Sequence, residues 1–240
     1  MPKSPSYLAQ VNEDLAETLA MLQVRTIAPV AMTAPILKTL LSMHHAVYSL
    51  CIWSHFVKVE EHGQLYLREI ASDAIQIEPH VLSGFSRTSM LLARSIIENT
   101  LRHIYFTDHP VEFERANRDV KFYLSAEELF EYSRNYIHFA EPEVRFQPLS
   151  KLRNEYRSLS ATVHGGRVND LSLHKALKTV VFDPADLDAQ VGHVKAVAEA
   201  CNFLLLIFHK NRSGKIPAPL RKVIMMTLAP KGRKVVQGLV

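Results

Sequence analysis

The sequence predicts an all-α protein, organised mainly as one helical bundle, on three observations. Apolar residues recur at helical spacing in successive segments, for example on one side of residues 6–25. Proline and glycine fall between these segments, as at Pro142, Pro148 and Gly165-Gly166. The 240 residues are 48% hydrophobic and 22% charged, which is typical of a globular domain with a sizeable core rather than of a disordered chain.

The first half of the chain is expected to be almost entirely helical. Pro79 suits the first turn of a helix, because proline has no amide hydrogen to lose there. Asp108-His109-Pro110 is expected to end that helix. In chain order, we expect helices over residues 6–25, from after Pro35 to about Phe56, over 65–77 and over 79–106, and a short helical turn over 111–119.

The second half begins with a helix-capping signature. Ser125 is followed three residues later by Glu128, which is the capping-box pattern. Asp183-Pro184 is a similar start signal for a long apolar helix. We expect helices over residues 126–139, 148–164, 184–210 and 219–228, an irregular segment over 167–182 with one short strand near 178–182, and a frayed terminus after 228.

Three regions are expected along the chain. Residues 1–78 would form an N-terminal helical layer, 79–214 the main bundle and 215–240 a basic C-terminal extension with no acidic residue. Residues 39–57 lack Asp, Glu, Lys and Arg and are long enough to span a bilayer, but their histidines and serines would be costly in lipid. We therefore expect a buried helix, no membrane association and a cytoplasmic location.

Composition and spacing exclude several common kinds of site. The chain has only two cysteines, Cys51 and Cys201, both in apolar runs, so a disulfide framework is excluded and no zinc-ligand spacing occurs. No glycine-rich phosphate loop and no Gly-x-Ser-x-Gly motif is present. We expect neither a cofactor nor a metal ion. The net charge of +4 is compatible with a polyanionic partner.

Arg157 and His164 are the residues most suggestive of chemistry. They lie seven positions apart on one expected helix, so they share a face, with Ser160 between them and Arg153 one turn earlier. An always-charged guanidinium beside an imidazole is suited to phosphate chemistry. The same residues have an alternative interpretation, in which Arg157 forms an ion pair and His164 is favoured by the C-terminal helix dipole.

Glu98 lies between Arg94 and Arg102 at i, i+4 spacing on an earlier helix. The simplest interpretation is a surface ladder of ion pairs. The functional alternative is that Glu98 orients an arginine or a histidine of a neighbouring helix.

Two segments together resemble the HEPN superfamily of all-helical domains, many of which are metal-independent ribonucleases of toxin and defence systems. They are Ala-Arg-Ser-Ile-Ile-Glu-Asn-Thr-Leu-Arg-His-Ile-Tyr-Phe at 93–106 and Tyr-Arg-Ser-Leu-Ser-Ala-Thr-Val-His-Gly at 156–165. Active members carry an arginine, four to six residues and a histidine, and Arg157 and His164 have the longest of these spacings. The resemblance covers about residues 81–210, and Ser158 departs from the Asn or Asp that often follows the arginine.

The resemblance implies an endoribonuclease that needs no metal. The RNA 2′-hydroxyl would attack its own phosphate, His164 would move the proton and Arg157 would stabilise the charge on phosphate oxygens, giving a 2′,3′-cyclic phosphate and a 5′-hydroxyl. Because one histidine does not readily serve as both acid and base, a homodimer is expected. Glu98 and Ser160 would support the site, and RNA would contact the arginines Arg94, Arg102, Arg153 and Arg167.

Two alternatives remain open. Arg134 and His138 form a runner-up pair whose four-residue offset would place both on one face of the expected helix. The second alternative is a catalytically inactive HEPN-like module that binds a protein partner or a nucleotide and regulates another enzyme. In either case an antitoxin or another defence-system protein is a possible partner.

Overall fold

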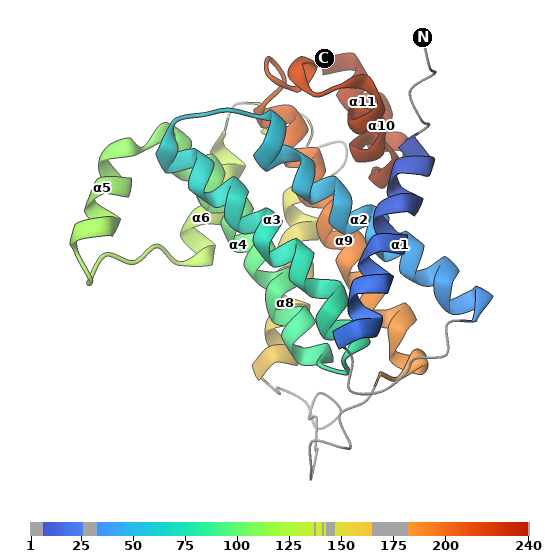
Figure 1. Cartoon of the computed structure of the whole chain (residues 1–240). Helices are drawn as coiled ribbons and strands as arrows, with labels where there is room; N and C mark the ends of the chain where they lie inside the picture. The colour runs from blue at the N-terminus through green and yellow to red at the C-terminus, as the bar shows by residue number, and fades with distance from the viewer. Residues whose placement is uncertain are drawn as a thin grey trace.

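The computed structural model describes residues 7–25, 33–136, 138–140, 142, 147–164 and 182–239. These residues are almost entirely helical and contain no strand, which confirms the all-α prediction. The helices are α1 (Tyr7–Arg25), α2 (Ala34–Phe56), α3 (Glu61–Leu82), α4 (Ser86–Asp108), α5 (Pro110–Arg118), α6 (Ala126–Asn135), α8 (Pro148–His164), α9 (Pro184–Phe208), α10 (Ala218–Thr227) and α11 (Pro230–Leu239), with a 3₁₀ turn at Ser213–Lys215 (Figure 1).

Helix α9 lies at the centre of the bundle, in contact with α2, α4 and α8 (Figure 1). Its C-terminal half is buried on nearly all sides, as expected of a helix surrounded by others. One contiguous core contains residues from Val11 in α1 to Val236 in α11. The expected boundary at residue 78 falls inside α3, and each of the three expected regions contributes side chains to this core.

Helix α9 is also the one helix in the described part of the chain that is long and apolar enough to cross a membrane by length and composition. Within its most apolar stretch of 18 residues, 67% of the residues are buried inside the protein.

Helix α2, which has no charged residue of the Asp, Glu, Lys or Arg type after Lys38, accommodates its histidines through specific partners. Nδ1 of His44 lies 3.0 Å from the Glu78 carboxylate and its Nε2 lies 2.8 Å from Asp14 of α1. His45 Nε2 lies 3.0 Å from the carbonyl oxygen of Val223 in α10. These contacts explain how imidazoles occur in an apolar helix: each buried ring is hydrogen-bonded to a neighbouring element.

The expected helix start at Pro79 is wrong. Helix α3 continues through Pro79 to Leu82, and α4 begins only at Ser86. Val81 and Leu82 are buried in the core, and their packing stabilises the last turn beyond the proline. The reversal occurs at Gly84, whose φ of 79° suits a residue without a Cβ atom.

In the second half of the chain, the expected start of α6 is confirmed, but the expected end of that helix and the expected frayed terminus are not. The capping box of α6 is confirmed, because the Glu128 amide donates to Ser125 Oγ while the Ser125 amide donates to the Glu128 carboxylate. However, α6 ends at Asn135 instead of near residue 139. The expected frayed terminus is wrong as well, since residues 230–239 form α11, in which Val236 is buried against the bundle. The expected strand near 178–182 lies almost wholly outside the described residues.

Candidate functional site

Helix α8 carries the residues that the sequence analysis singled out. It begins at Pro148, directly after Gln147, whose φ of 54° turns the chain into the helix. Leu152 and Leu159 are fully buried, and α8 packs on α4 and α9. Burial of this apolar stripe fixes the rotation of the helix, so the opposite side faces solvent.

Arg157 and His164 both lie on the solvent side of α8 and are exposed. Seven residues separate them by about 10 Å along the helix axis and about 20° around it. Neither side chain forms an ion pair or hydrogen bond with any residue that the structure describes. The two groups are therefore accessible to a ligand on one shared face.

Ser160 and Arg153 are placed differently from this pair. The Ser160 side chain is half-buried, and its Oγ has no hydrogen-bond partner within the described part of the chain. The Arg153 guanidinium forms ion pairs with Glu127 and, at 3.8 Å, with Glu131, both in α6. Arg153 therefore connects α8 to α6, and its charge is already partly neutralised.

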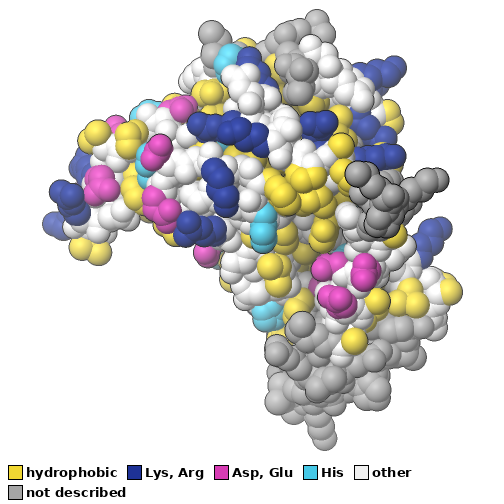
Figure 2. All heavy atoms as spheres, turned by 45° about the horizontal axis from the view of Figure 1, so that its top comes forward, with side chains coloured by type: hydrophobic (Ala, Val, Ile, Leu, Met, Phe, Trp, Pro, Cys, Tyr) yellow, Lys and Arg dark blue, Asp and Glu magenta, His cyan; other side chains and the backbone are white. Residues whose placement is uncertain are grey.

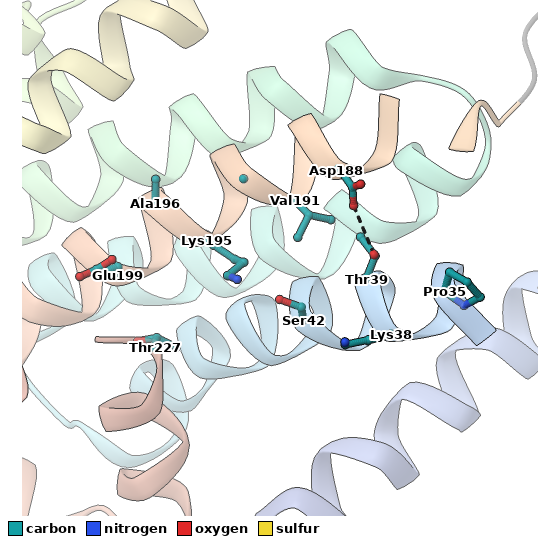
Figure 3. Close-up of a pocket in the computed structure, with 11 residues that line it drawn as sticks. Pro35, Lys38, Thr39, Ser42, Asp188, Val191, Lys195, Ala196, Glu199 and Thr227 are labelled. Carbon is teal, nitrogen blue, oxygen red and sulfur yellow. Dashed lines mark hydrogen bonds between the residues drawn. The ribbon is translucent and has the colours of Figure 1, made fainter. Parts of the chain in front are cut away.

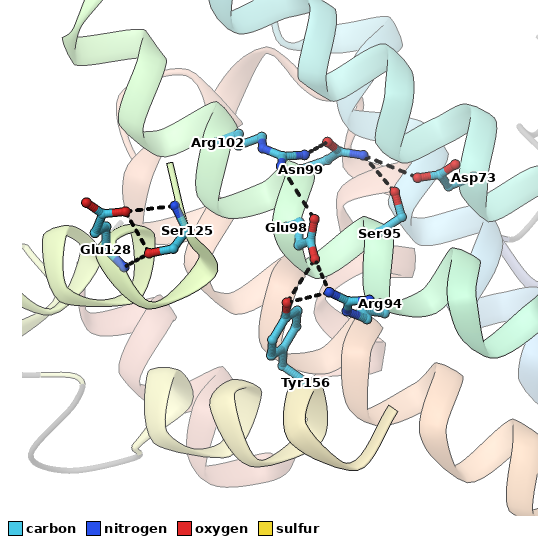
Figure 4. A network of polar contacts seen from close by, with 9 residues as sticks. All are labelled: Asp73, Arg94, Ser95, Glu98, Asn99, Arg102, Ser125, Glu128 and Tyr156. Carbon is cyan, nitrogen blue, oxygen red and sulfur yellow. Dashed lines mark hydrogen bonds and ion pairs between the residues drawn. The ribbon is translucent and has the colours of Figure 1, made fainter. Parts of the chain in front are cut away.

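Glu98 lies in a network between α4 and α8 (Figure 4). Its carboxylate is 3.0 Å from Arg94 and 3.5 Å from Arg102 and accepts a 2.9 Å hydrogen bond from the Tyr156 hydroxyl. Arg94 in turn donates to the Tyr156 oxygen at 2.8 Å. Glu98 thus forms the expected ion pairs within its own helix, and its contact with α8 is to a tyrosine and not to the arginine or histidine of the functional interpretation.

Tyr156 is the residue of this network that sequence reasoning missed. Its helical spacing placed it on the apolar face of α8, and its ring does lie 6.0 Å from that of Phe130. Burial raises the pKa of the Tyr156 hydroxyl, which therefore stays protonated and donates to Glu98. A tyrosine on an apolar face usually needs a polar partner for its hydroxyl, and that was the available signal.

The network continues from α4 to α3 (Figure 4). The Asn99 side chain accepts a hydrogen bond from Arg102 at 3.4 Å and donates to Asp73 at 3.3 Å and to Ser95 at 3.2 Å. Burial raises the pKa of Asp73. The result is a connected set of polar contacts that links α3, α4 and α8 behind the face of Arg157 and His164.

A second polar contact holds α8 on its other side. Nδ1 of His193 in α9 lies 2.5 Å from the Glu155 carboxylate. This hydrogen bond and the charge of Glu155 raise the pKa of His193, against the opposing effect of burial. Glu155 is therefore occupied by His193, and it is not the ion-pair partner of Arg157.

The runner-up pair does not form one helical face. Arg134 is in the last turn of α6 and pairs with Glu131 at 3.1 Å. His138 is exposed and lies in a turn beyond the end of that helix, because the backbone of Tyr136 is extended. Arg167 lies outside the described residues.

A groove of about 650 Å³ lies between α2 and α9, with Thr227 of α10 at one end (Figure 3). Lys38 and Lys195 line it together with Asp188 and Glu199, so its charge is mixed. None of the site residues expected from the sequence lines this groove. Within the described part of the chain, no group of three or more His, Cys, Asp or Glu side chains is arranged to hold a metal ion.

Basic side chains are spread over the face that includes the C-terminal helices (Figure 2). Lys231 and Lys234 of α11 are exposed, as is Lys222 of α10. Figure 2 also shows apolar side chains between the basic ones and acidic side chains gathered toward two edges. The surface is therefore basic in part, in agreement with the net charge of +4.

Comparison of the chain with family models, with curated proteins and with solved structures finds no match in any of the three.

Proposed function

We propose that this protein is a metal-independent endoribonuclease of HEPN type that acts as a homodimer in the cytoplasm, in a toxin or antiviral defence setting. The observation that carries the proposal is the exposure of Arg157 and His164 on one face of α8, with no competing partner in the described residues. A guanidinium and an imidazole in this state are available to a phosphodiester, whereas paired side chains would first have to be released.

In this mechanism the substrate supplies the nucleophile. His164 accepts the proton of the ribose 2′-hydroxyl, and Arg157 donates hydrogen bonds to the phosphate oxygens as negative charge develops on them. The 2′-oxygen forms a bond to phosphorus and the bond to the 5′-oxygen breaks. His164 of the second copy returns a proton to that leaving oxygen, so the dimer supplies both base and acid.

The neighbouring residues have supporting roles in this proposal. The Glu98–Tyr156 hydrogen bond fixes α8 against α4, and so positions the helix that carries Arg157. Arg94 and Arg102 are occupied by Glu98, so their contribution to RNA binding is weaker than the sequence alone implies. The basic side chains of α10 and α11 add salt-dependent attraction for RNA phosphates.

The test is RNA cleavage in the presence of EDTA by four proteins: wild type, His164→Ala, Arg157→Ala and His138→Ala. Loss of cleavage in the first two variants but not in the third, with 2′,3′-cyclic phosphate ends in the product, supports the proposal. Equal cleavage by wild type and His164→Ala would refute it. Because all three positions are exposed, the substitutions are expected to leave folding unchanged.

The rival proposal is a non-catalytic helical module that regulates a partner protein. It is favoured by the Glu98 network, in which every charged group pairs internally and none reaches Arg157 or His164. If wild type and all three variants are equally inert on RNA, and the chain binds a partner through the exposed face of α8, the regulatory module is the correct function.

A further inference from the structure

A second, separate polar cavity opens where three helices end. It has a volume of about 330 Å³, at the small end of the range for ligand pockets. Asp108 is the last residue of α4, Tyr136 directly follows α6, and Phe208 is the last residue of α9. None of the residues assigned above to RNA cleavage lines this cavity.

His209 is the buried polar group in the wall of this cavity and is only 2% exposed. Its Nε2 lies 2.7 Å from Nε2 of His103, whose Nδ1 lies 2.9 Å from the carbonyl oxygen of Gly63. A carbonyl oxygen can only accept, so His103 carries its proton on Nδ1 and accepts at Nε2. His209 must then carry its proton on Nε2, which leaves its Nδ1 as a lone-pair acceptor.

Both imidazoles are neutral in this arrangement. Burial lowers the pKa of His103 to about 4 and lowers that of His209 well below its ordinary value. Nδ1 of His209 has no hydrogen-bond donor among the residues that the structure describes. This nitrogen is therefore able to accept a hydrogen bond from a donor on a molecule bound in the cavity.

One side of the cavity, at the C-terminal ends of α4 and α9, favours a positive charge. Three helix C-termini converge on it, each with partly negative carbonyl ends, and the last turns of α4 and α9 contain no basic residue. The Asp108 carboxylate adds a full negative charge; its Oδ2 accepts from Tyr132 at 2.8 Å, and its Oδ1 has no donor among the described residues. The ring centroids of Tyr136 and Phe208 lie 5.4 Å apart, and aromatic rings attract a cation placed over their faces.

Another side of the cavity, in the turn that follows α9, has the opposite character. Arg212 and Asn211 line it and are exposed. The Arg212 guanidinium has no carboxylate partner in the described part of the chain, and its fork of donors matches a carboxylate. Cation-binding and anion-binding groups therefore occupy the same small space.

We propose that this cavity binds a small zwitterion of the amino-acid type, with its ammonium group toward Asp108 and His209 and its carboxylate toward Arg212. The ammonium group supplies a donor for His209 Nδ1, and the two charges of the ligand match the Asp108 carboxylate and the Arg212 guanidinium that line the cavity. This site is independent of the proposed ribonuclease activity and does not use Arg157 or His164.

Isothermal titration calorimetry on the full chain tests the proposal. The individual L-amino acids are titrated as probes, with butylamine and butyrate as controls that carry only one of the two charges. At least one amino acid is expected to bind, and both controls are expected to bind at least about tenfold more weakly. Absence of binding by every amino acid, or equal binding of either control, would overturn the proposal.

Variants then locate the site. Asp108→Asn and Arg212→Gln alter exposed side chains and are each expected to weaken binding of the amino acid by about tenfold or more. Asp186→Asn and Arg118→Gln are matched controls, since both side chains are exposed and lie outside the cavity, and they are expected to bind as wild type does. Unchanged binding in both cavity variants would show that the amino acid binds elsewhere and would refute the assignment.

Discussion

Replacing Asn202 by alanine is expected to lower the free energy of unfolding by about 2–6 kcal/mol. Asn202 is fully buried in α9; it accepts from Trp53 Nε1 at 2.7 Å and donates to Ser49 Oγ at 2.7 Å and Thr227 Oγ1 at 3.1 Å. The two hydroxyls also donate to backbone carbonyls of their own helices, so each loses only one bond of roughly 0.5–1.5 kcal/mol. The indole N–H of Trp53 is left buried without an acceptor, at about 1–3 kcal/mol.

Urea unfolding of wild type, Asn202→Ala, Trp53→Phe and the double variant measures this cost and separates its sources. The Trp53→Phe variant has no indole N–H that could lose its acceptor. In that variant, Asn202→Ala is therefore expected to lower the free energy of unfolding by about 1–3 kcal/mol less than it does in wild type. An equal cost in both backgrounds would refute the reasoning, because the Trp53 hydrogen bond would then contribute nothing. The same result would mean that the hydrogen bond between Trp53 and Asn202 does not help to hold α2 against α9.

Three further predictions follow from packing and charge. Gly63→Ala is expected to destabilise the fold by about 1 kcal/mol in urea unfolding, because the added Cβ would lie 2.6 Å from Thr107 Oγ1, which outweighs the gain in helix propensity. Burial alone would lower the pKa of His44, but its two carboxylate partners raise it overall. Protonated His44 therefore stabilises the fold fully below about pH 6.5, and this stabilisation is lost as the pH rises through the raised pKa. The difference in free energy of unfolding between wild type and His44→Asn should shrink accordingly as the pH is raised. Val236→Asp should release α11 and accelerate its amide hydrogen exchange, whereas Lys234→Asp, at an exposed position, should not.

Much of the fold could be predicted because helical periodicity and capping signals act locally. Ser125 and Glu128 are three residues apart, so their capping box is visible in the sequence and fixes the start of α6. The errors have tertiary causes. Pro79 is a sound start signal by itself, but packing of Val81 and Leu82 in the core holds the chain in α3. Likewise α11 is stabilised by burial of Val236 against distant helices, which its basic composition did not reveal.

The polar contacts of the site were less predictable, since they join residues far apart in the chain. Glu98 and Tyr156 are 58 positions apart, and the residues of the buried pair His103 and His209 are 106 apart. Helical spacing assigns each of these residues to a face but does not specify which helix covers that face. The shared face of Arg157 and His164 was predictable because both residues lie on one helix, where spacing alone determines the geometry.

The position of Arg157 and His164 on α8 makes the proposed dimer a requirement of the mechanism. The two Cα atoms are separated by about 10 Å along the axis, and side chains on a helix lean toward its N-terminus. His164 therefore leans toward Arg157, while Arg157 leans away from His164. The distance between the imidazole and the guanidinium of one copy remains too wide for a single phosphate to contact both. A second copy related by a two-fold axis perpendicular to α8 would run its own α8 in the opposite sense and bring its own imidazole toward the first guanidinium. Analytical ultracentrifugation at the assay concentration should therefore detect a dimer. Full RNA cleavage by a strictly monomeric protein would contradict this geometry.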